Sequence, residues 1–454
     1  MVRSKYTFYS YYEPDVLLVY NSLHGASSFL KFCGDDAVTA EDCINFPENH
    51  CGEEIFNVLL DHGIIVPKEN VESSICNILS WKRIFSSGLT LIIMPTEDCN
   101  FRCAYCYEDH KNGIMSRSTA EAIKKYVAKN ISSYTNLHVV WFGGEPLMSQ
   151  KTIDIIKDIS DSLIKICSCA RRSYSSDIIT NGYNLTYPIF KSLLDCKILS
   201  YQVTIDGTAD THDAQRFLAT GEKTRDKIIS NLLDIKNNCN KKYFSIIIRT
   251  NISLSMESSL VDHYSELSKL FSDDSRFSFF FRPVGNWGGE RVLEMCDNIY
   301  DSISFRKIYN QITEFQSKYN LDFSRFASFY NDSSCSACYE NSFILGFNGE
   351  VYKCSCHFDE PDNRIGSLSK EGVMMIDASK LSKWVKAPVL KESCHKCFFA
   401  PACLNMSCPI YSNEIRRSKD DFDDCPYEKK YIKETLLLLE RSGCFRTIRL
   451  TDGT

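Results

Sequence analysis

Short apolar runs alternate with longer amphipathic stretches through the middle of the chain. Between the runs, apolar residues recur at the spacing of one helix face, as in 119–131, 152–166 and 225–238. The runs are rich in β-branched and aromatic side chains, which favours strands; they cover 90–96, 137–144, 173–180, 200–206, 244–250 and 277–284. Six strand and helix repeats predict an α/β fold in which a parallel sheet curves into a partial (β/α)6 barrel. Functional groups of such a barrel gather at the C-terminal ends of its strands.

The two flanks of this region have a different character. The N-terminal part begins with aromatic, strand-like stretches, continues with a helical pattern at 53–63 and closes on a strand at 64–68. A helical segment near 305–319 precedes a stretch dense in cysteines, and the last amphipathic helix has a glycine just past its end. We predict five parts: a small domain at 1–80, the barrel at 88–300, a bridging helix and linker at 301–333, a metal-organised domain at 334–426, and a C-terminal helix and tail at 427–454.

Composition narrows the class of protein. The chain has 454 residues, 44% of them hydrophobic, and its net charge of −6 with scattered basic residues argues against a nucleic-acid partner. No apolar run reaches the ~18 residues needed to cross a membrane, and the N-terminus lacks the apolar core of a secretion signal. We therefore expect a cytoplasmic protein without a membrane partner. Disulfides are rare in that compartment, so metal ligation explains the clustered members of the 22 cysteines best.

Three cysteines follow the first predicted strand in the spacing C-x3-C-x2-C. They are Cys99, Cys103 and Cys106. Structural zinc sites and the 4Fe-4S clusters of electron carriers use four protein ligands. Three thiolates therefore predict a cluster in which one iron is left for another ligand, and that iron is where chemistry would occur.

Small and polar residues follow the other predicted strands. Gly143-Gly144-Glu145-Pro146 lets the backbone approach a ligand closely beside a carboxylate. Later strand ends carry Thr180-Asn181-Gly182, Asp206-Gly207 and Arg249-Thr250-Asn251. Any one of these would by itself be explained by loop construction. Together they predict a rim whose polar groups suit an amino-acid carboxylate, a ribose and an amine.

A second cysteine pattern lies within 334–426. It contains C-x2-C pairs, a G-x4-C element and a final Cys-Pro, and its members are Cys335, Cys338, Cys354, Cys394, Cys397, Cys403, Cys408 and Cys425. Such pairs suit two zinc sites as well as iron-sulfur clusters. Cys356 is left over two residues after Cys354, either as an alternate ligand or as a bystander.

These motifs together resemble the radical S-adenosylmethionine (SAM) enzymes, which share the three-cysteine loop, the GGEP element and a partial, TIM-like barrel. The resemblance implies that SAM completes the open iron and is cleaved by one electron to a 5′-deoxyadenosyl radical, which abstracts a hydrogen atom from the substrate. It assigns Cys99, Cys103 and Cys106 to the cluster, and to SAM it assigns Tyr105, Gly143, Gly144, Glu145, Pro146, Thr180, Asn181, Gln202, Asp206 and Arg249. The segment from Asp206 through His212, Asp213 and Arg216 resembles the DG...HD..R element of the same subfamily, for which a structural brace is an equal interpretation.

The later cysteines resemble the SPASM domain, which houses two auxiliary 4Fe-4S clusters. By the crossed ligation of that family, Cys335, Cys338, Cys354 and Cys408 would hold the first cluster, and Cys394, Cys397, Cys403 and Cys425 the second. The family usually has three residues before the cysteine that corresponds to Cys408, and this chain has four. The resemblance thus implies three 4Fe-4S clusters.

Radical SAM enzymes with this extension mostly modify peptides, and many carry an N-terminal element that binds a leader peptide. Residues 1–80 resemble such a winged-helix-like element, whose strand edge would pair with an extended leader. We predict a maturase that crosslinks a ribosomally made precursor peptide through a thioether or carbon-carbon bond, with flavodoxin or ferredoxin as electron donor; no general base can be identified. One alternative is sulfatase maturation to formylglycine, whose catalytic Asp would stand at Ser355. The other is a non-catalytic, zinc-organised binding protein.

Overall fold

A computed structural model describes residues 1–49, 52–82, 84–285, 290–300, 305–316, 329, 335–385, 392–403, 409–412, 425 and 427–448. The chain forms two compact units. The N-terminal unit comprises Met1–Phe85, Phe323–Tyr339 and Lys386–Thr454, and the barrel unit comprises Ser86–Asp322 and Glu340–Val385. No helix in the described ranges is long and apolar enough to span a membrane.

All six predicted strands are present in the barrel unit. They lie parallel, in the spatial order β11-β10-β9-β8-β7-β6. Parallel neighbours need a crossover connection, so the C-terminal ends of all six strands come to one edge of the sheet. The bounds are β6 Leu89–Ile93, β7 Asn136–Trp141, β8 Ser173–Thr180, β9 Ile198–Thr204, β10 Ser245–Ile252 and β11 Phe277–Pro283.

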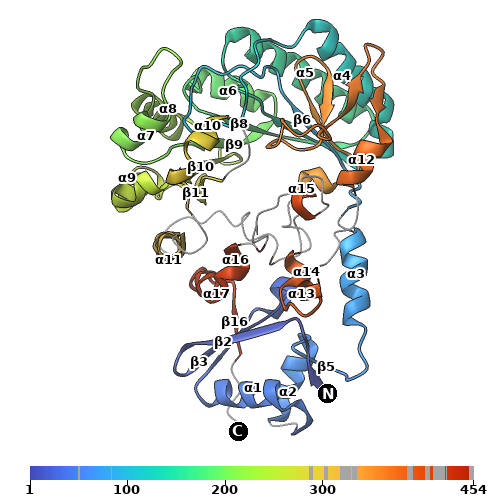
Figure 1. Cartoon of the computed structure of the whole chain (residues 1–454), viewed down its shortest axis with the longest axis vertical. Helices are drawn as coiled ribbons and strands as arrows, with labels where there is room; N and C mark the ends of the chain where they lie inside the picture. The colour runs from blue at the N-terminus through green and yellow to red at the C-terminus, as the bar shows by residue number, and fades with distance from the viewer. Residues whose placement is uncertain are drawn as a thin grey trace. The chain divides into compact units, whose positions relative to one another are not determined.

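Amphipathic helices cover the outer face of this sheet (Figure 1). Along β7, Leu137, Val139 and Trp141 are fully buried, whereas His138 and Val140 between them stay partly exposed. This alternation is the two-residue period of a strand, and it leaves the concave face accessible while the other face packs. The helices are α4 Arg117–Asn130, α5 Gln150–Cys169, α6 Tyr187–Asp195, α7 Ala209–Gln215, α8 Arg225–Asn238 and α9 Leu260–Phe271.

The sheet continues past β6 in a way that the apolar pattern did not predict. A further strand pairs parallel with β6, and three antiparallel strands follow it, which makes ten strands in one sheet. Each added strand has three to five residues, too few for an alternating pattern to be visible. Residues 340–385 are therefore built onto the barrel sheet. The elements are β12 Ser342–Leu345, β13 Glu350–Tyr352, β14 Arg364–Leu368, β15 Met374–Ile376 and α12 Ala378–Trp384.

The N-terminal unit contains its own four-stranded sheet, in the order β16-β4-β3-β2. Strands β2 to β4 are antiparallel, and β16, from the other end of the sequence, adds parallel to β4. Leu17, Val19 and Phe32 pack with apolar residues of α1 and α2. The bounds are β1 Val2–Arg3, β2 Thr7–Glu13, β3 Val16–Asn21, β4 Leu30–Cys33, α1 Asp35–Asn45, α2 Glu53–Asp61, β5 Ile65–Val66, α17 Ile432–Arg441 and β16 Arg446–Thr447. The remaining α-helices of the described residues are α3 Glu72–Lys82, α10 Glu290–Glu294, α11 Phe305–Gln316, α13 Glu392–His395, α14 Ala400–Cys403, α15 Pro409–Ser412 and α16 Tyr427–Lys430.

Candidate active site

A cavity of about 270 Å³ lies in the barrel unit, lined by the loops that follow the parallel strands. The predicted site residues in its lining are Cys99, Cys103, Tyr105, Cys106, Gly143, Gly144, Glu145, Thr180, Asn181, Gln202 and Arg249. Of the residues predicted to contact SAM, Pro146 and Asp206 are not part of the lining. Asp206 is fully buried and accepts a hydrogen bond from the Tyr105 hydroxyl. It therefore holds in position a residue that lines the cavity.

The loop after β7 requires both of its glycines. Gly143 has a φ of +115°, a conformation that residues with a side chain rarely adopt. A side chain on Gly143 or Gly144 would collide with the backbone carbonyls of Thr96 and Asp98. The N–H groups of Gly144 and Glu145 donate to these same two carbonyls at 3.3 and 3.0 Å. The glycines therefore hold this loop directly against the loop that carries Cys99.

Glu145 joins the loops of two neighbouring strands. Its buried carboxylate accepts hydrogen bonds from the Thr180 hydroxyl and the Asn181 N–H, both at 2.6 Å, and from the Leu147 N–H at 2.8 Å. Burial raises the pKa of Glu145, and these three donors oppose that rise because they favour the ionised form. The Asn181 amide donates in turn to the Asn100 side chain at 2.8 Å. The cysteine loop, the glycine loop and the end of β8 thus form one connected rim.

The three cysteines of the first loop share one cavity wall. Cys103 is buried, and Cys99 and Cys106 are half-buried. Within the described ranges, no three His, Cys, Asp or Glu side chains converge as ligands of a single metal ion. A cubane cluster takes its thiolates at separate irons and does not need such convergence, so three cysteines that line one cavity have the donor chemistry of a 4Fe-4S cluster.

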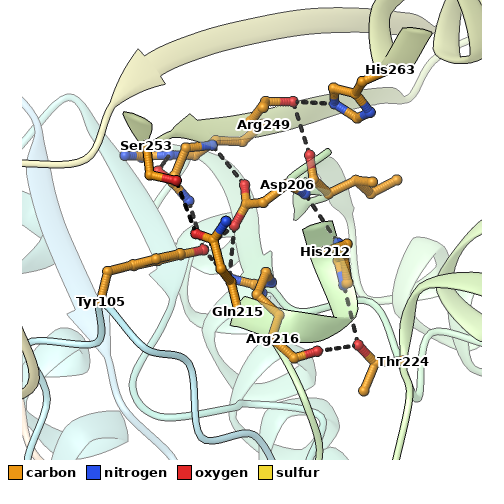
Figure 2. A network of polar contacts seen from close by, with 12 residues as sticks. Tyr105, Asp206, His212, Gln215, Arg216, Thr224, Arg249, Ser253 and His263 are labelled. Carbon is orange, nitrogen blue, oxygen red and sulfur yellow. Dashed lines mark hydrogen bonds and ion pairs between the residues drawn. The ribbon is translucent and has the colours of Figure 1, made fainter. Parts of the chain in front are cut away.

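Figure 2 shows a polar network around Asp206, into which the Tyr105 hydroxyl points from one side. The Tyr105 hydroxyl donates to Asp206 and accepts from Arg216 at 2.5 Å and from the Asn251 amide at 3.1 Å. Arg216 also pairs with Asp206 at 3.6 Å, and its guanidinium lies over the Phe101 ring at 5.6 Å. Both side chains are buried, so the Asp206 carboxylate depends on the permanent charge of Arg216 to compensate its own. The network fixes the position of Tyr105 in the wall.

A chain of hydrogen bonds also fixes the segment from His212 to Arg216 (Figure 2). The Asp206 N–H donates to His212 Nδ1 at 3.0 Å, His212 Nε2 lies 3.1 Å from the Thr224 hydroxyl, and that hydroxyl donates to the Arg216 carbonyl at 2.6 Å. Burial lowers the pKa of His212 well below its usual value, so a neutral ring with its proton on Nε2 satisfies both contacts. Asp213 accepts two backbone N–H groups at the start of α8, at 2.9 and 3.0 Å. The segment braces the connection between β9 and α8.

Part of the cavity wall was missed by sequence reasoning. Glu108, Ser355 and Cys356 also line the cavity. The position of Glu108, two residues after Cys106, was an available signal, and burial raises the pKa of this carboxyl to about 8. Ser355 and Cys356 stood out in the sequence, the first at the place of a catalytic Asp and the second as a leftover cysteine. Their place in this cavity could not be predicted, because it depends on β12 and β13 joining the barrel sheet.

The turn that carries these residues is clamped by Asn363, which is fully buried. The Asn363 side chain accepts from two N–H groups of the turn and donates to two of its carbonyls, at 2.7 to 3.0 Å. Ser355 and Cys356 line the cavity, whereas Cys354 is buried and outside the lining. A hydrogen bond with the Cys354 thiol is the largest cause that lowers the pKa of Cys356 to about 7, against its burial. That cause would be lost if Cys354 ligated iron as predicted, because an iron-bound thiolate has no proton to donate.

The predicted auxiliary-cluster cysteines divide between the two units. Cys335 and Cys338 belong to the N-terminal unit and Cys354 to the barrel unit, while Cys408 lies outside the described residues. The other four, Cys394, Cys397, Cys403 and Cys425, all belong to the N-terminal unit. The Lys429 ammonium donates to Cys425 Sγ at 3.1 Å. The thiols of Cys397 and Cys403 also contribute to raising the pKa of Lys429. Three of these four cysteines therefore lie around one cation; their ligation of iron stays a prediction.

Comparison with known proteins defines the class of the barrel. Residues 93–253 match the radical SAM superfamily. This part of the chain is a radical SAM domain and the protein is a radical SAM enzyme, which implies a 4Fe-4S cluster and SAM as cofactors. The predicted family and the predicted α/β partial barrel are confirmed.

Individual relatives extend the likeness beyond that domain. The chain is 23% identical over 345 residues to the cysteine-type anaerobic sulfatase-maturating enzyme of Clostridium novyi (strain NT), a match that covers 70% of this chain and 87% of that one. The structure of native anSMEcpe with bound AdoMet and Cp18Cys peptide aligns with a TM-score of 0.59 at 17% identity, over 78% of this chain and 97% of that one. Streptococcus suis SuiB bound to precursor peptide SuiA aligns with a TM-score of 0.47 at 15% identity, over 94% and 99%. The last score is too low to support an inference.

Proposed function

We propose that this protein is a radical SAM maturase of a ribosomally made precursor peptide and that it forms an oxidative crosslink, most readily a thioether. One observation carries the radical chemistry: the three cysteines of the first loop and the Glu145 loop line the same cavity at the strand ends. A peptide substrate is supported by anSMEcpe, whose structure holds AdoMet together with a peptide.

The residues of the cavity fit the two cofactors. When bound, the cluster and SAM supply the 5′-deoxyadenosyl radical that removes a hydrogen atom from the substrate. Cys99, Cys103 and Cys106 would hold the cluster. The Glu145 loop would receive the methionyl amine, since Gly143, Gly144 and Glu145 all line the cavity. Thr180, Asn181, Gln202 and Arg249 would lie near the ribose and the carboxylate, and Tyr105, held by Asp206, near the adenine.

Clusters held by the C-terminal cysteines would take up the electron that a crosslink releases. Crosslinking is a net two-electron oxidation, and abstraction of one hydrogen atom accounts for only one electron. We assign the other to two auxiliary 4Fe-4S clusters held by the eight cysteines of the SPASM-like pattern. A flavodoxin or ferredoxin would supply the electron that starts each turnover.

The N-terminal unit offers an edge for an extended leader peptide. Strand β2 is the edge strand on one side of its sheet. On the other side, β4 is paired with β16. A groove of about 300 Å³ runs beside β2, lined by residues such as Tyr11 and Tyr12 of β2 and Lys433 of α17. Backbone pairing with β2 would give affinity, and the groove would accept side chains of the leader.

Sulfatase maturation is the second candidate, favoured by the activity named for the Clostridium novyi relative. In such enzymes a catalytic Asp follows the cysteine of the G-x4-C element. In this chain that place is Ser355, whose hydroxyl lines the cavity but is not a base near neutral pH. Peptide crosslinking therefore remains the first proposal.

Anaerobic metal analysis tests the cofactor content. Three cubanes predict about 12 iron per chain. Replacing Cys99, Cys103 and Cys106 with Ala should remove about four of them and abolish SAM cleavage, while the auxiliary iron remains. A protein that contains only zinc and does not cleave SAM would contradict the proposal.

Coexpression with any small Cys-rich or repeat-rich peptide found to be encoded next to the gene tests the product. A crosslinked peptide loses two hydrogen atoms, which mass spectrometry detects, and fragmentation locates the bond. An aldehyde formed on a sulfatase-derived peptide, without any crosslinked product, would instead favour sulfatase maturation.

A further inference from the structure

Cys356 is a reactive group of the cavity to which the proposed function gives no role. It lines the same cavity as Cys99, Cys103 and Cys106, although it lies far from them in the sequence. Its neighbour Cys354, the predicted cluster ligand, is outside that lining. The structure therefore gives these two cysteines different surroundings, one facing the site of radical formation and one not.

The surroundings of Cys356 hold its side chain in place. The turn is clamped by the four hydrogen bonds of Asn363. The Cys356 N–H donates to Cys354 Sγ at 3.4 Å, and the Tyr107 hydroxyl lies beside its thiol. The Ser355 hydroxyl lies 4.0 Å from the sulfur. A thiol held in this way has a defined position toward a molecule in the cavity.

A thiol has a particular reactivity toward carbon radicals. Its S–H bond is weaker than the O–H bond of an alcohol and than most C–H bonds of a peptide, so a carbon radical readily takes its hydrogen atom. Among the residues beside Cys356, Ser355 cannot act in this way. The Tyr107 phenol, which lies beside the Cys356 thiol, has an O–H bond that is comparably weak.

We propose that Cys356 is a catalytic thiol that returns a hydrogen atom to a carbon radical of the bound peptide. The S–H bond breaks, a C–H bond forms on the peptide, and a thiyl radical remains on Cys356. One electron from the flavodoxin- or ferredoxin-class reductant and one proton from water restore the thiol. The change is redox-neutral for the peptide, while the reductant supplies the electrons for SAM cleavage and for the thiol. It inverts the carbon when hydrogen returns to the opposite face. The inference rests on the proposed function in one respect: a carbon radical must form in the cavity next to a bound peptide.

The test uses the reconstituted holoenzyme in D₂O with SAM and a chemical reductant, and without peptide. The thiol then exchanges to S–D and becomes the nearest deuterium source for a carbon radical in the cavity. We expect 5′-deoxyadenosine that carries one deuterium, measured by mass spectrometry. Cys356→Ala and Cys356→Ser should lose this label while SAM cleavage continues, and Ser355→Ala should keep it.

Several outcomes separate this inference from the proposed function. Label retained in both Cys356 variants overturns the inference, and so does label lost in Tyr107→Phe but kept in Cys356→Ala, since the phenol is then the donor. Absence of any 5′-deoxyadenosine overturns the proposed function as well. Production of unlabelled 5′-deoxyadenosine by the unmodified enzyme overturns the inference alone.

A second measurement does not depend on turnover. Cys356 should react with a small alkylating reagent in the anaerobic, iron-loaded protein, whereas Cys354 should react only after the iron is removed. Peptide mapping identifies the labelled residue, and Cys356→Ala should leave the iron content unchanged. A loss of about four iron in Cys356→Ala would show instead that Cys356 is a cluster ligand and would overturn the inference.

Discussion

Two cations lie beside two sets of cysteines, and their surroundings differ. In the barrel unit, the charge of Arg216 opposes the rise that burial causes in the pKa of Cys103. Arg216 is also paired with Asp206 and hydrogen-bonded to Tyr105. In the N-terminal unit, Lys429 donates directly to the sulfur of Cys425. The charge of the first cation is matched by a carboxylate, whereas the charge of the second acts on the cysteines themselves.

This difference corresponds to two requirements. A site that positions SAM and a radical needs fixed geometry, and the Arg216 pair supplies it through buried hydrogen bonds in several directions. A site that passes electrons needs an adjusted reduction potential, which charges and hydrogen bonds near cluster sulfurs set. We therefore expect changes in the barrel network to cost stability, and a change of Lys429 to shift a potential.

The largest effect is expected from Arg216→Met. It leaves Asp206 buried without its cation, which costs about 3–5 kcal/mol of unfolding free energy. Urea unfolding at pH 7.5 measures the loss. Burial already raises the pKa of Asp206, so the deficit should shrink as the pH falls and the carboxyl takes up a proton in the folded state. A deficit that is equal at all pH values would show that Asp206 does not depend on Arg216.

The next effect is a loss of stability in acid that comes from a buried histidine of the barrel unit. Burial lowers the pKa of His263 to about 3, and its Nε2 lies 3.0 Å from the Thr250 hydroxyl. Below about pH 6.5, His263 takes up a proton in the unfolded chain but stays neutral in the folded protein. The free energy of unfolding therefore falls by about 1.4 kcal/mol per pH unit. Unfolding between pH 7.5 and 5 measures this slope, and His263→Gln should reduce it by that amount. An unchanged slope would show that His263 is not the group responsible.

A smaller cost is expected from Asp213→Ala. The substitution removes the acceptor of two backbone N–H groups at the start of α8, which costs about 1 kcal/mol, as for other helix caps. Asp213→Asn keeps an acceptor oxygen and should recover most of the loss. If both variants lose stability equally, the charge rather than the hydrogen bonds is what matters.

The smallest stability change, with a distinct electronic effect, is expected from Lys429→Met. Removal of the cation beside Cys425 should lower the reduction potential of the proposed cluster by an amount on the order of tens of millivolts. A redox titration followed by electron paramagnetic resonance measures this shift. Lys429→Arg keeps the charge and should retain most of the potential. The potential of the SAM-binding cluster should stay the same; if both clusters shift together, the effect is not local to Cys425.

The sequence predicted the barrel and most of its rim because both follow from local patterns. Six apolar runs gave six strands, and the residues after them meet since parallel strands end at one edge. The wall at Ser355 and Cys356 was not predictable in this way, because it depends on short strands pairing with β6 across a long stretch of sequence. The partners of Asp206 are also non-local: Tyr105 comes from the cysteine loop and Asn251 from the end of β10.

The pairing of β16 with β4 has a consequence for how the protein is made. The sheet of the N-terminal unit begins near residue 7, yet its fourth strand comes from Arg446–Thr447. Domains generally fold as the ribosome delivers them, but this sheet must wait until the whole barrel sequence has emerged. The unit proposed to capture the precursor peptide is thus completed last, so a chain interrupted during synthesis would carry an unfinished recognition unit.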